Sequence, residues 1–471
     1  MQKLWLKLRS SLPLALAALF ATFAVLTIPN YPYLITDALS EKAVLSYAHQ
    51  KGWCFGTDLV FTYGPLGFLS SRYYFAPAAG LRTIVDLLFC FMVSAGIVRV
   101  AGRMNRVARW SLIGAFIFLT ANIDPRYDLL LYLGIFSWGL LCLIESGQWF
   151  GLAAACFVLL AAFGILVKAN FVFASGLGLV AICGDLALRR KYRAPLAVVT
   201  GFIMVFFAGW FASGQTVANL IPFFARLIPI VKGYNSAVGF DGLQILRSRG
   251  VLTAVLVLLI VVVRSLLAFD PAAGYPGVTS SNEKDAAKDK HEPGITQSVP
   301  STGSRPDEWF ARWPRRVLLV SWLLGLLLMT WKHGFVRADL FHMGFFFGFV
   351  PVLGIALEVL PSKSSAARTC ARGLTAFCAL VVIFTLVAWS FPSLSSSVGQ
   401  PFRSAAINLR ALFSPSAYRG QMLEVKVGAD NVEYALLEGD CLVIRHETEQ
   451  IQLTPEHPVA VRPVSKWYGK A

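Results

Sequence analysis

Long apolar runs recur along this chain, and they limit its fold more than any other feature. Each approaches the roughly 20 residues that a helix needs to cross the hydrocarbon core of a bilayer. Three of them, at 110–123, 129–144 and 317–331, are short enough to be half-spans or paired short helices. The sequence therefore predicts an all-α integral membrane protein with about eleven transmembrane helices, at 12–28, 81–98, 110–123, 129–144, 150–167, 171–188, 195–213, 251–269, 317–331, 343–360 and 373–391.

Composition favours the same membrane location. Hydrophobic residues make up 56% of the 471 and charged residues only 14%, against about 25% in ordinary soluble domains. The 42 Lys and Arg residues exceed the 26 Asp and Glu residues, which gives a net charge of +16. In a soluble protein this excess would suggest nucleic acid binding, but between apolar spans it indicates basic cytoplasmic loops. We therefore expect membrane lipid, and no nucleic acid, as a partner.

Basic residues predict how the chain is oriented in the membrane. With eleven spans, the main basic groups before and between the spans all fall on one side, which the positive-inside rule assigns to the cytoplasm. We therefore expect a multi-pass protein of the bacterial inner membrane, with a cytoplasmic N-terminus and a periplasmic or extracellular C-terminus. The basic groups are Lys3, Lys7, Arg9, Arg99, Arg103, Arg106, Arg109, Arg189–Arg193, Arg312, Arg315, Arg316, Lys363, Arg368 and Arg372.

The polar remainder divides the chain into a membrane domain at 1–391 and an extracytoplasmic tail at 392–471. Residues 270–308 mix Pro, Gly, Ser and charge without apolar periodicity, so we expect a disordered cytoplasmic linker. In the tail, "MLEVKVG", "VEYALLEGDCLVIRHE" and "PVAVRPV" alternate apolar and polar residues. That alternation predicts short strands and a small β-rich piece.

One outer segment, at 214–250, has the pattern of an interfacial helix. Its "NLIPFFARLIPIVKGY" combines apolar residues with Arg226 and Lys232. Such a helix lies in the plane of the membrane surface, where basic side chains meet the headgroups. The two cations could therefore reach lipid phosphates or simply anchor the helix.

The stretch "WKHGFVRADLFH" gathers five ionisable residues at the end of an apolar run, namely Lys332, His333, Arg337, Asp339 and His342. Arg with Lys or His is suited to binding a phosphate group, and Asp339 could pair with Arg337 and orient it. Lysine side chains at the end of a span also snorkel to the membrane surface, which is the plainer interpretation of Lys332 and of Lys168 in another loop. Spacing places no third ligand beside Asp339 and His342, so no metal site is assigned.

The first outer loop, at 29–80, carries a second group of polar residues. Thr36 can cap a helix that begins near Asp37 and ends at Gly52. The chain then passes Asp58 and returns towards the membrane through an aromatic turn at Tyr63. Asp37 also fits a plainer role, because the dipole of a helix favours a carboxylate at its N-terminus. Asp58 fits a loop carboxylate equally, and Asp124 and Asp128 around Pro125 fit turn residues.

Asp37, Gly52-Trp53 and Tyr63-Gly64-Pro65-Leu66 occur in the order seen in one family. The loop resembles the first outer loop of the GT-C superfamily of glycosyltransferases, which includes protein O-mannosyltransferases and lipid A aminoarabinose transferases. The resemblance covers about the first 80 residues by motif. The chain departs from the family in having Ala38, where relatives often have Glu, and Gly64-Pro65 in place of a Lys-Pro-Pro element.

This resemblance implies a GT-C-like membrane fold and a sugar donor on polyprenyl phosphate, presented at the outer face of the membrane to an envelope acceptor. It implies that Asp37 acts as the catalytic base or holds a metal, with Asp58 as a second catalytic carboxylate; a divalent cation is left open as a cofactor. The positions expected to bind substrate phosphate are Lys168, Lys332, His333, Arg337, His342 and Tyr63, with Asp339 orienting them.

Two other functions are alternatives to the glycosyltransferase. An O-antigen polymerase or ligase would use the same kind of lipid-linked sugar, but its site lies in a large loop late in the chain. A lipid or solute transporter would need ionisable residues along its spans. Here the main candidates are Asp86 and Arg264, each near the end of a span. The acidic residues of the first outer loop favour the glycosyltransferase.

Overall fold

The computed structural model describes residues 2–29, 40–71, 74–123, 126–238, 306–335, 340–360 and 394–423, a few positions from 369 to 380, and three strands within 434–453. The predicted span at 251–269 lies outside the described residues, as do most of the predicted span at 373–391 and of the predicted linker at 270–308. The same is true of Asp37, Arg337 and Asp339.

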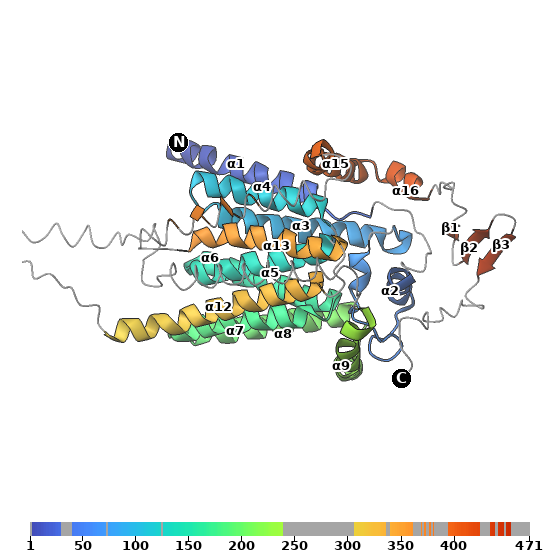
Figure 1. The fold of residues 1–471 in the computed structure, drawn as a ribbon. Coiled ribbons are helices and arrows are strands. Elements are labelled where there is room, and N and C mark those ends of the chain that lie inside the picture. The colour runs from blue at the N-terminus through green and yellow to red at the C-terminus, as the bar shows by residue number, and fades with distance from the viewer. Residues whose placement is uncertain are drawn as a thin grey trace, which may run out of the picture.

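The described chain is mostly helical, and its long helices run lengthwise beside one another (Figure 1). Short 3₁₀ turns lie at Gly67–Ser70, Ala76–Ala78 and Leu357–Val359. The helices are α1 (Gln2–Val25), α2 (Ser40–Lys51), α3 (Ala79–Ala101), α4 (Arg106–Asn122), α5 (Arg126–Ile144), α6 (Gly147–Val167), α7 (Phe171–Leu188), α8 (Arg193–Ala212), α9 (Val217–Val238), α12 (Pro306–Phe335), α13 (Leu340–Ala356), α15 (Leu394–Phe413) and α16 (Pro415–Leu423).

Helix α5 forms the centre of the bundle. Every residue from Tyr127 to Ile144 is buried. Its sequence is apolar on all sides after the first turn, and such a helix is stable only when other helices or lipid surround it. Here the surrounding elements are α3, α6, α7 and α13. The most completely buried of the candidate membrane spans therefore positions the residues at its own N-terminal end.

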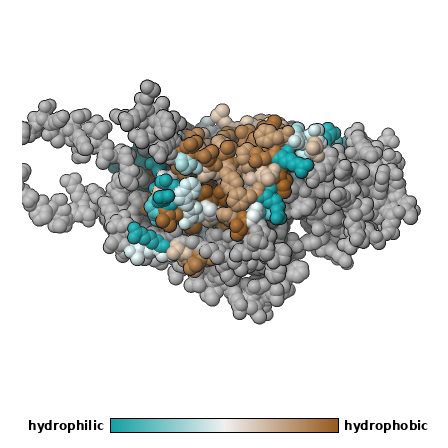
Figure 2. Space-filling view, turned by 90° about the horizontal axis from the view of Figure 1, so that it is seen from above, coloured by the Kyte–Doolittle hydropathy of each residue, from teal (hydrophilic) through white to brown (hydrophobic). Residues whose placement is uncertain are grey.

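Six of the described helices are long and apolar enough to cross a membrane: α3, α5, α6, α7, α8 and the part of α12 from Trp313 to Phe335. Shorter apolar helices lie at Leu12–Val25, Val217–Ile230 and Gly344–Val359. Figure 2 shows a hydrophobic band across the middle of one face, with hydrophilic residues at both of its ends. A mostly helical protein with several helices long and apolar enough to cross a membrane is thus confirmed, and the count of eleven stays a prediction.

Acidic residues at one end of the bundle bind the basic residues that were expected to share one side of the membrane. Nη2 of Arg99 lies 3.1 Å from Oε1 of Glu145. Nη2 of Arg189 lies 2.7 Å from Oδ2 of Asp185, and Nε of Arg315 lies 2.5 Å from Oδ1 of the same residue. Arg103 contacts Glu145 as well. Because these arginines come from α3, α12 and the turns after α3 and α7, the ion pairs hold the ends of several helices together.

Three short strands lie in the tail: β1 (Tyr434–Glu438), β2 (Cys441–His446) and β3 (Glu449–Leu453). They form an antiparallel sheet in the order β1-β2-β3, with Tyr434 opposite Arg445 and Leu442 opposite Leu453. The first two strands fall within "VEYALLEGDCLVIRHE". Of the other two expected strand segments, the first begins at Met422 and Leu423, which are instead the last residues of helix α16. The rest of both segments lies outside the described residues, and the extracytoplasmic place of this piece stays a prediction.

Candidate functional site

A buried carboxylate, that of Asp128, is the centre of a polar cluster at the other end of the bundle. Asp128 lies in the first turn of α5, and its residue is 3% exposed. Unpaired backbone N–H groups at a helix start favour a negative charge there. Oδ2 of Asp128 lies 2.6 Å from Nζ of Lys168 and 3.7 Å from Nε2 of His333. Three separate helices, α5, α6 and α12, therefore contribute to one cluster.

Lys168 owes its position to the way α6 ends. Its backbone N–H still bonds to the carbonyl of Gly164, at 2.8 Å, but its own φ and ψ of −152° and 125° are extended. The chain then turns into α7. This change of direction leaves the Lys168 side chain beside the start of α5, with 15% of it exposed. A snorkelling lysine would point away from the bundle, whereas this one is paired with Asp128.

The aromatic turn of the first outer loop docks on the same helix end. The N–H of Gly64 donates to the carbonyl of Val167 at 3.0 Å, and that of Ala169 donates to Thr62 at 2.9 Å. A Cβ on Gly64 would lie 2.3 Å from the carbonyl oxygen of Leu166, so only glycine allows this approach. The turn brings the ring of Tyr63 to 4.8 Å from Nζ of Lys168, within the range of a cation–π contact.

His333 reaches the cluster from the last turn of α12. Its ring centroid lies 4.3 Å from that of Phe345 in α13 and 6.3 Å from that of His342. The side chain of His333 is 13% exposed. The packing of α12 against α13 therefore places two imidazoles at the end of the bundle where Lys168 and Asp128 already meet.

Three further polar atoms near these residues are buried without a hydrogen-bond partner among the described residues. They are the hydroxyl of Tyr132, Oδ1 of Asn170 and Nε1 of Trp331. Tyr132 lies one helical turn after Asp128, Asn170 follows Lys168 by two positions, and Trp331 precedes His333 by two. Buried polar groups are normally paired, so this region retains capacity to bind a polar group or water.

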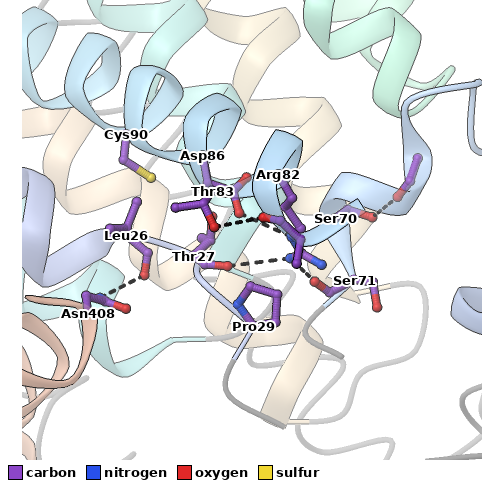
Figure 3. A network of polar contacts seen from close by, with 12 residues as sticks. Leu26, Thr27, Pro29, Ser70, Ser71, Arg82, Thr83, Asp86, Cys90 and Asn408 are labelled. Carbon is purple, nitrogen blue, oxygen red and sulfur yellow. Dashed lines mark hydrogen bonds and ion pairs between the residues drawn. The ribbon is translucent and has the colours of Figure 1, made fainter. Parts of the chain in front are cut away.

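A second buried network, shown in Figure 3, lies at the start of α3. Nε of Arg82 is 3.2 Å from Oδ2 of Asp86, and both residues are buried in α3. The Arg82 guanidinium also donates to the carbonyls of Thr27 and Ser71. Thr27 lies just before the first outer loop, and Ser71 lies near its end. The guanidinium thus ties the two ends of that loop to α3.

One histidine and one tyrosine outside the spans, His49 and Tyr418, are packed against other outer segments. The ring of His49 in α2 stacks on that of Phe68 at 3.8 Å, and burial lowers the pKa of His49 below its usual 6.5. Tyr418 of α16 donates to the carbonyl of Pro29, and burial raises the pKa of Tyr418 above its usual range. The described part of this end is therefore packed and not a set of loose loops.

The structure brings together some of the sequence-predicted site residues and not others. Lys168, His333, His342 and Tyr63 converge. Lys332, half-buried, precedes His333 in α12. Asp58 is exposed in a turn, where its Oδ2 accepts a hydrogen bond from the N–H of Cys54 at 2.9 Å. The described contacts of Asp58 are thus those of a turn residue.

The sequence favours a turn role over a functional role for Asp128, and the structure makes this residue the centre of the cluster. A carboxylate at the start of an otherwise wholly apolar helix was the signal that could have found it. Within the described part of the chain, no three His, Cys, Asp or Glu side chains gather closely enough to hold a metal ion.

No family model matches the chain, and neither a curated protein nor a solved structure shows significant similarity to it. The site must therefore be interpreted from its own chemistry. Lys168 supplies a cation, and His333 supplies a second nitrogen that can donate or accept a hydrogen bond. Asp128 contacts both side chains and fixes the position of Lys168. Such a set can bind an anionic oxygen and stabilise negative charge that develops on it.

Proposed function

We propose that this protein is a GT-C-type membrane glycosyltransferase that moves a sugar from a polyprenyl-phosphate-linked donor to an acceptor of the cell envelope. The observation that carries the proposal is the cluster of Lys168, Asp128 and His333 beside the docked Tyr63 turn. A lipid-linked donor would present its phosphate at the membrane surface, and this cluster lies at the ends of membrane-crossing helices.

In the proposed reaction the acceptor hydroxyl attacks the anomeric carbon of the donor sugar. Asp37 takes the proton of that hydroxyl, and the bond between the sugar and the phosphate oxygen breaks. The polyprenyl phosphate leaves with the bonding electrons, so negative charge develops on its oxygens. Lys168 and His333, with Lys332, Arg337 and His342 nearby in sequence, would stabilise this charge. Asp128 keeps Lys168 in place.

The remaining assignments belong to the same proposal. The end of the bundle with Arg99, Glu145 and Asp185 faces the cytoplasm of a bacterium, and the end with Asp128 faces outwards. The chain crosses the inner membrane about eleven times, and the β-rich tail lies outside. The positive-inside rule supports this orientation, since Arg99, Arg103, Arg189 and Arg315, which flank the spans, gather at the first end.

The distribution of buried charge favours an enzyme over a lipid or solute transporter. Transporters commonly carry ionisable residues within their spans, along the path of the cargo. Among the described residues, the buried charged side chains all lie within about two turns of a helix end. They are Arg82, Asp86, Asp128, Glu145 and Asp185. A polymerase or ligase that uses the same lipid-linked donor remains the alternative enzyme.

The test is sugar transfer by the full chain in lipid nanodiscs, with radiolabelled polyprenyl-phosphate sugars as donors and envelope lipid as acceptor. We expect transfer by the wild type, and a loss of about 10²–10⁴-fold in Asp37→Asn, as for removal of a general base. Lys168→Gln should also lose activity, whereas Lys191→Gln, an exposed lysine at the other end, should not. Full activity in Asp37→Asn would refute the assigned base, and flux across vesicles without transfer would favour the transporter.

A further inference from the structure

We propose that α9 lies in the membrane surface, with one face in lipid and the other face holding the first outer loop at the bilayer interface. This inference concerns lipid contact and loop position, and it does not depend on glycosyl transfer.

The outward face of α9 carries an apolar stripe. Val217, Ile221 and Ile228 lie at intervals of four and seven residues, which places them on one side of a helix, and all three are exposed. Phe224, between them, is half-buried, with its ring centroid 6.4 Å from that of Phe206 in α8. Ile221 is 78% exposed and Ile228 is 56% exposed. A row of large aliphatic side chains left in water would be costly, so this stripe indicates an apolar surrounding.

The connection to α8 identifies that surrounding as lipid. Helix α8 is one of the candidate membrane spans and ends at Ala212. Only four residues separate it from α9, and Gly214 turns the chain there with a φ of +79°. Four residues reach at most about 14 Å, so the start of α9 stays near the bilayer surface. Figure 1 shows α9 strongly foreshortened beside the end of the lengthwise α8.

The inward face of α9 is hydrogen-bonded to the first outer loop. The guanidinium of Arg226 donates to the carbonyl of Gly56 at 2.8 Å, so this contact uses one of the two cations that could have reached lipid phosphates. Just before α9, the side chain of Gln215 accepts from the N–H of Phe55 at 2.7 Å and donates to the carbonyl of Trp53 at 3.0 Å. Three successive contacts thus join the loop to α9 and the turn before it.

Gly56 shows how closely the two backbones approach. Its φ is +93°, and a Cβ built on it would lie 2.4 Å from the backbone nitrogen of Phe223. Phe223 itself is 2% exposed on the inward face of α9. No larger residue fits at position 56 without moving the loop away from α9. The loop's depth relative to the bilayer is therefore set by α9.

Lipid contact is tested by photocrosslinking of the full chain in native membranes. The photoreactive residue p-benzoylphenylalanine is placed at position 221 on the stripe, at position 223 on the opposite face of α9, and at position 203 on the exposed side of α8. We expect lipid adducts, detected by mass spectrometry, at 221 in amounts similar to 203 and at least five-fold above 223. A crosslinked dimer of the chain at 221, or lipid adducts at 221 no more frequent than at 223, would overturn the proposal.

Loop holding is tested by amide hydrogen exchange in residues 53–59. Gly56→Ala should raise exchange at Phe55 by at least ten-fold, because the added methyl group separates the loop from α9. Gly52→Ala is the matched control, since Gly52 also has a positive φ, +65°, but has no atom within 4 Å of a Cβ. Gly52→Ala should leave exchange in 53–59 unchanged. Equal exchange in the two variants would refute the role of α9 in holding the loop.

Discussion

The pairing of Asp128 with Lys168 raises the question of why a membrane protein keeps an ion pair that is largely buried. Only 4% of the Asp128 side chain and 15% of the Lys168 side chain are exposed. Removing two charges from water is expensive, and a well-packed apolar pair is often as stable or more stable. Stability alone therefore does not account for the pair. The proposed function, which needs Lys168 charged and fixed in one place, gives a reason to keep the pair.

A double-mutant experiment separates these two roles. Asp128→Asn and Lys168→Gln, made singly, should each destabilise the fold by about 3–5 kcal/mol, because each leaves a buried charge without its partner. Combining them removes both charges, so thermal stability in detergent should recover largely. Sugar transfer should remain lost in the double variant, since the phosphate-binding cation is absent. Recovery of transfer together with stability would show that the pair is purely structural.

The sequence could indicate part of this site and not its centre. Lys168, His333 and His342 are ionisable residues at the ends of apolar runs, so they stand out by their surroundings. Asp128 and Lys168 are 40 positions apart, and no spacing rule connects them. Their contact follows from the packing of α5 against α6. Packing of that kind is decided by the whole bundle and not by local pattern.

At the scale of elements, the Tyr63–Gly64–Pro65 turn caps the C-terminal end of α6. The turn and the residue after it donate hydrogen bonds to the last carbonyls of α6, which would otherwise lack partners. The N–H of Leu66 donates to the carbonyl of Leu166 at 2.9 Å, and that of Gly64 donates to the carbonyl of Val167 at 3.0 Å. Unpaired carbonyls at a helix end need such partners when they are buried. The turn also carries Tyr63 to Lys168, so it links loop position to site geometry.

Gly64→Ala tests this docking. The new methyl group would collide with the carbonyl of Leu166, so we expect a loss of stability of about 1–3 kcal/mol, as for other overpacked sites. Gly114→Ala in α4 is the control, because a Cβ there meets no atom within 4 Å. The measurement is thermal unfolding of both variants in the same detergent. Equal stability of the two variants would show that the turn tolerates displacement.

Helix positions were largely predictable, and helix ends were not. Apolar runs located α3, α5, α6, α7 and α8, because burial of apolar surface in lipid or protein needs such runs. The run at 317–331 seemed too short for a span, yet α12 extends over Pro306–Phe335. Its ends include Arg315, Arg316 and Lys332, which interrupt the apolar pattern without ending the helix. Long cationic side chains tolerate this because their charged groups reach out of the apolar layer.

At the scale of the whole molecule, the two ends of the bundle carry different polar clusters. One end gathers paired arginines around Glu145 and Asp185, together with exposed residues of the turn after α7. The other end carries the Asp128 cluster, the docked first outer loop and α9. Sequence counting predicted this separation, because alternate loops must lie on alternate sides once the spans are placed. The orientation of the chain in the membrane can therefore be tested by labelling one position at each end.

Labelling with a membrane-impermeant maleimide in bacterial spheroplasts tests that orientation. Thr57→Cys places a thiol in an exposed position of the first outer loop, and Lys191→Cys places one in the exposed turn after α7. We expect position 57 to react in intact spheroplasts and position 191 to react only after they are lysed, with the wild-type chain giving the background from native cysteines. The proposed site needs this arrangement, because its donor and acceptor lie outside the cell membrane. Labelling of position 191 before lysis, with position 57 protected, would place the Asp128 cluster in the cytoplasm and rule out the proposed reaction at the outer face.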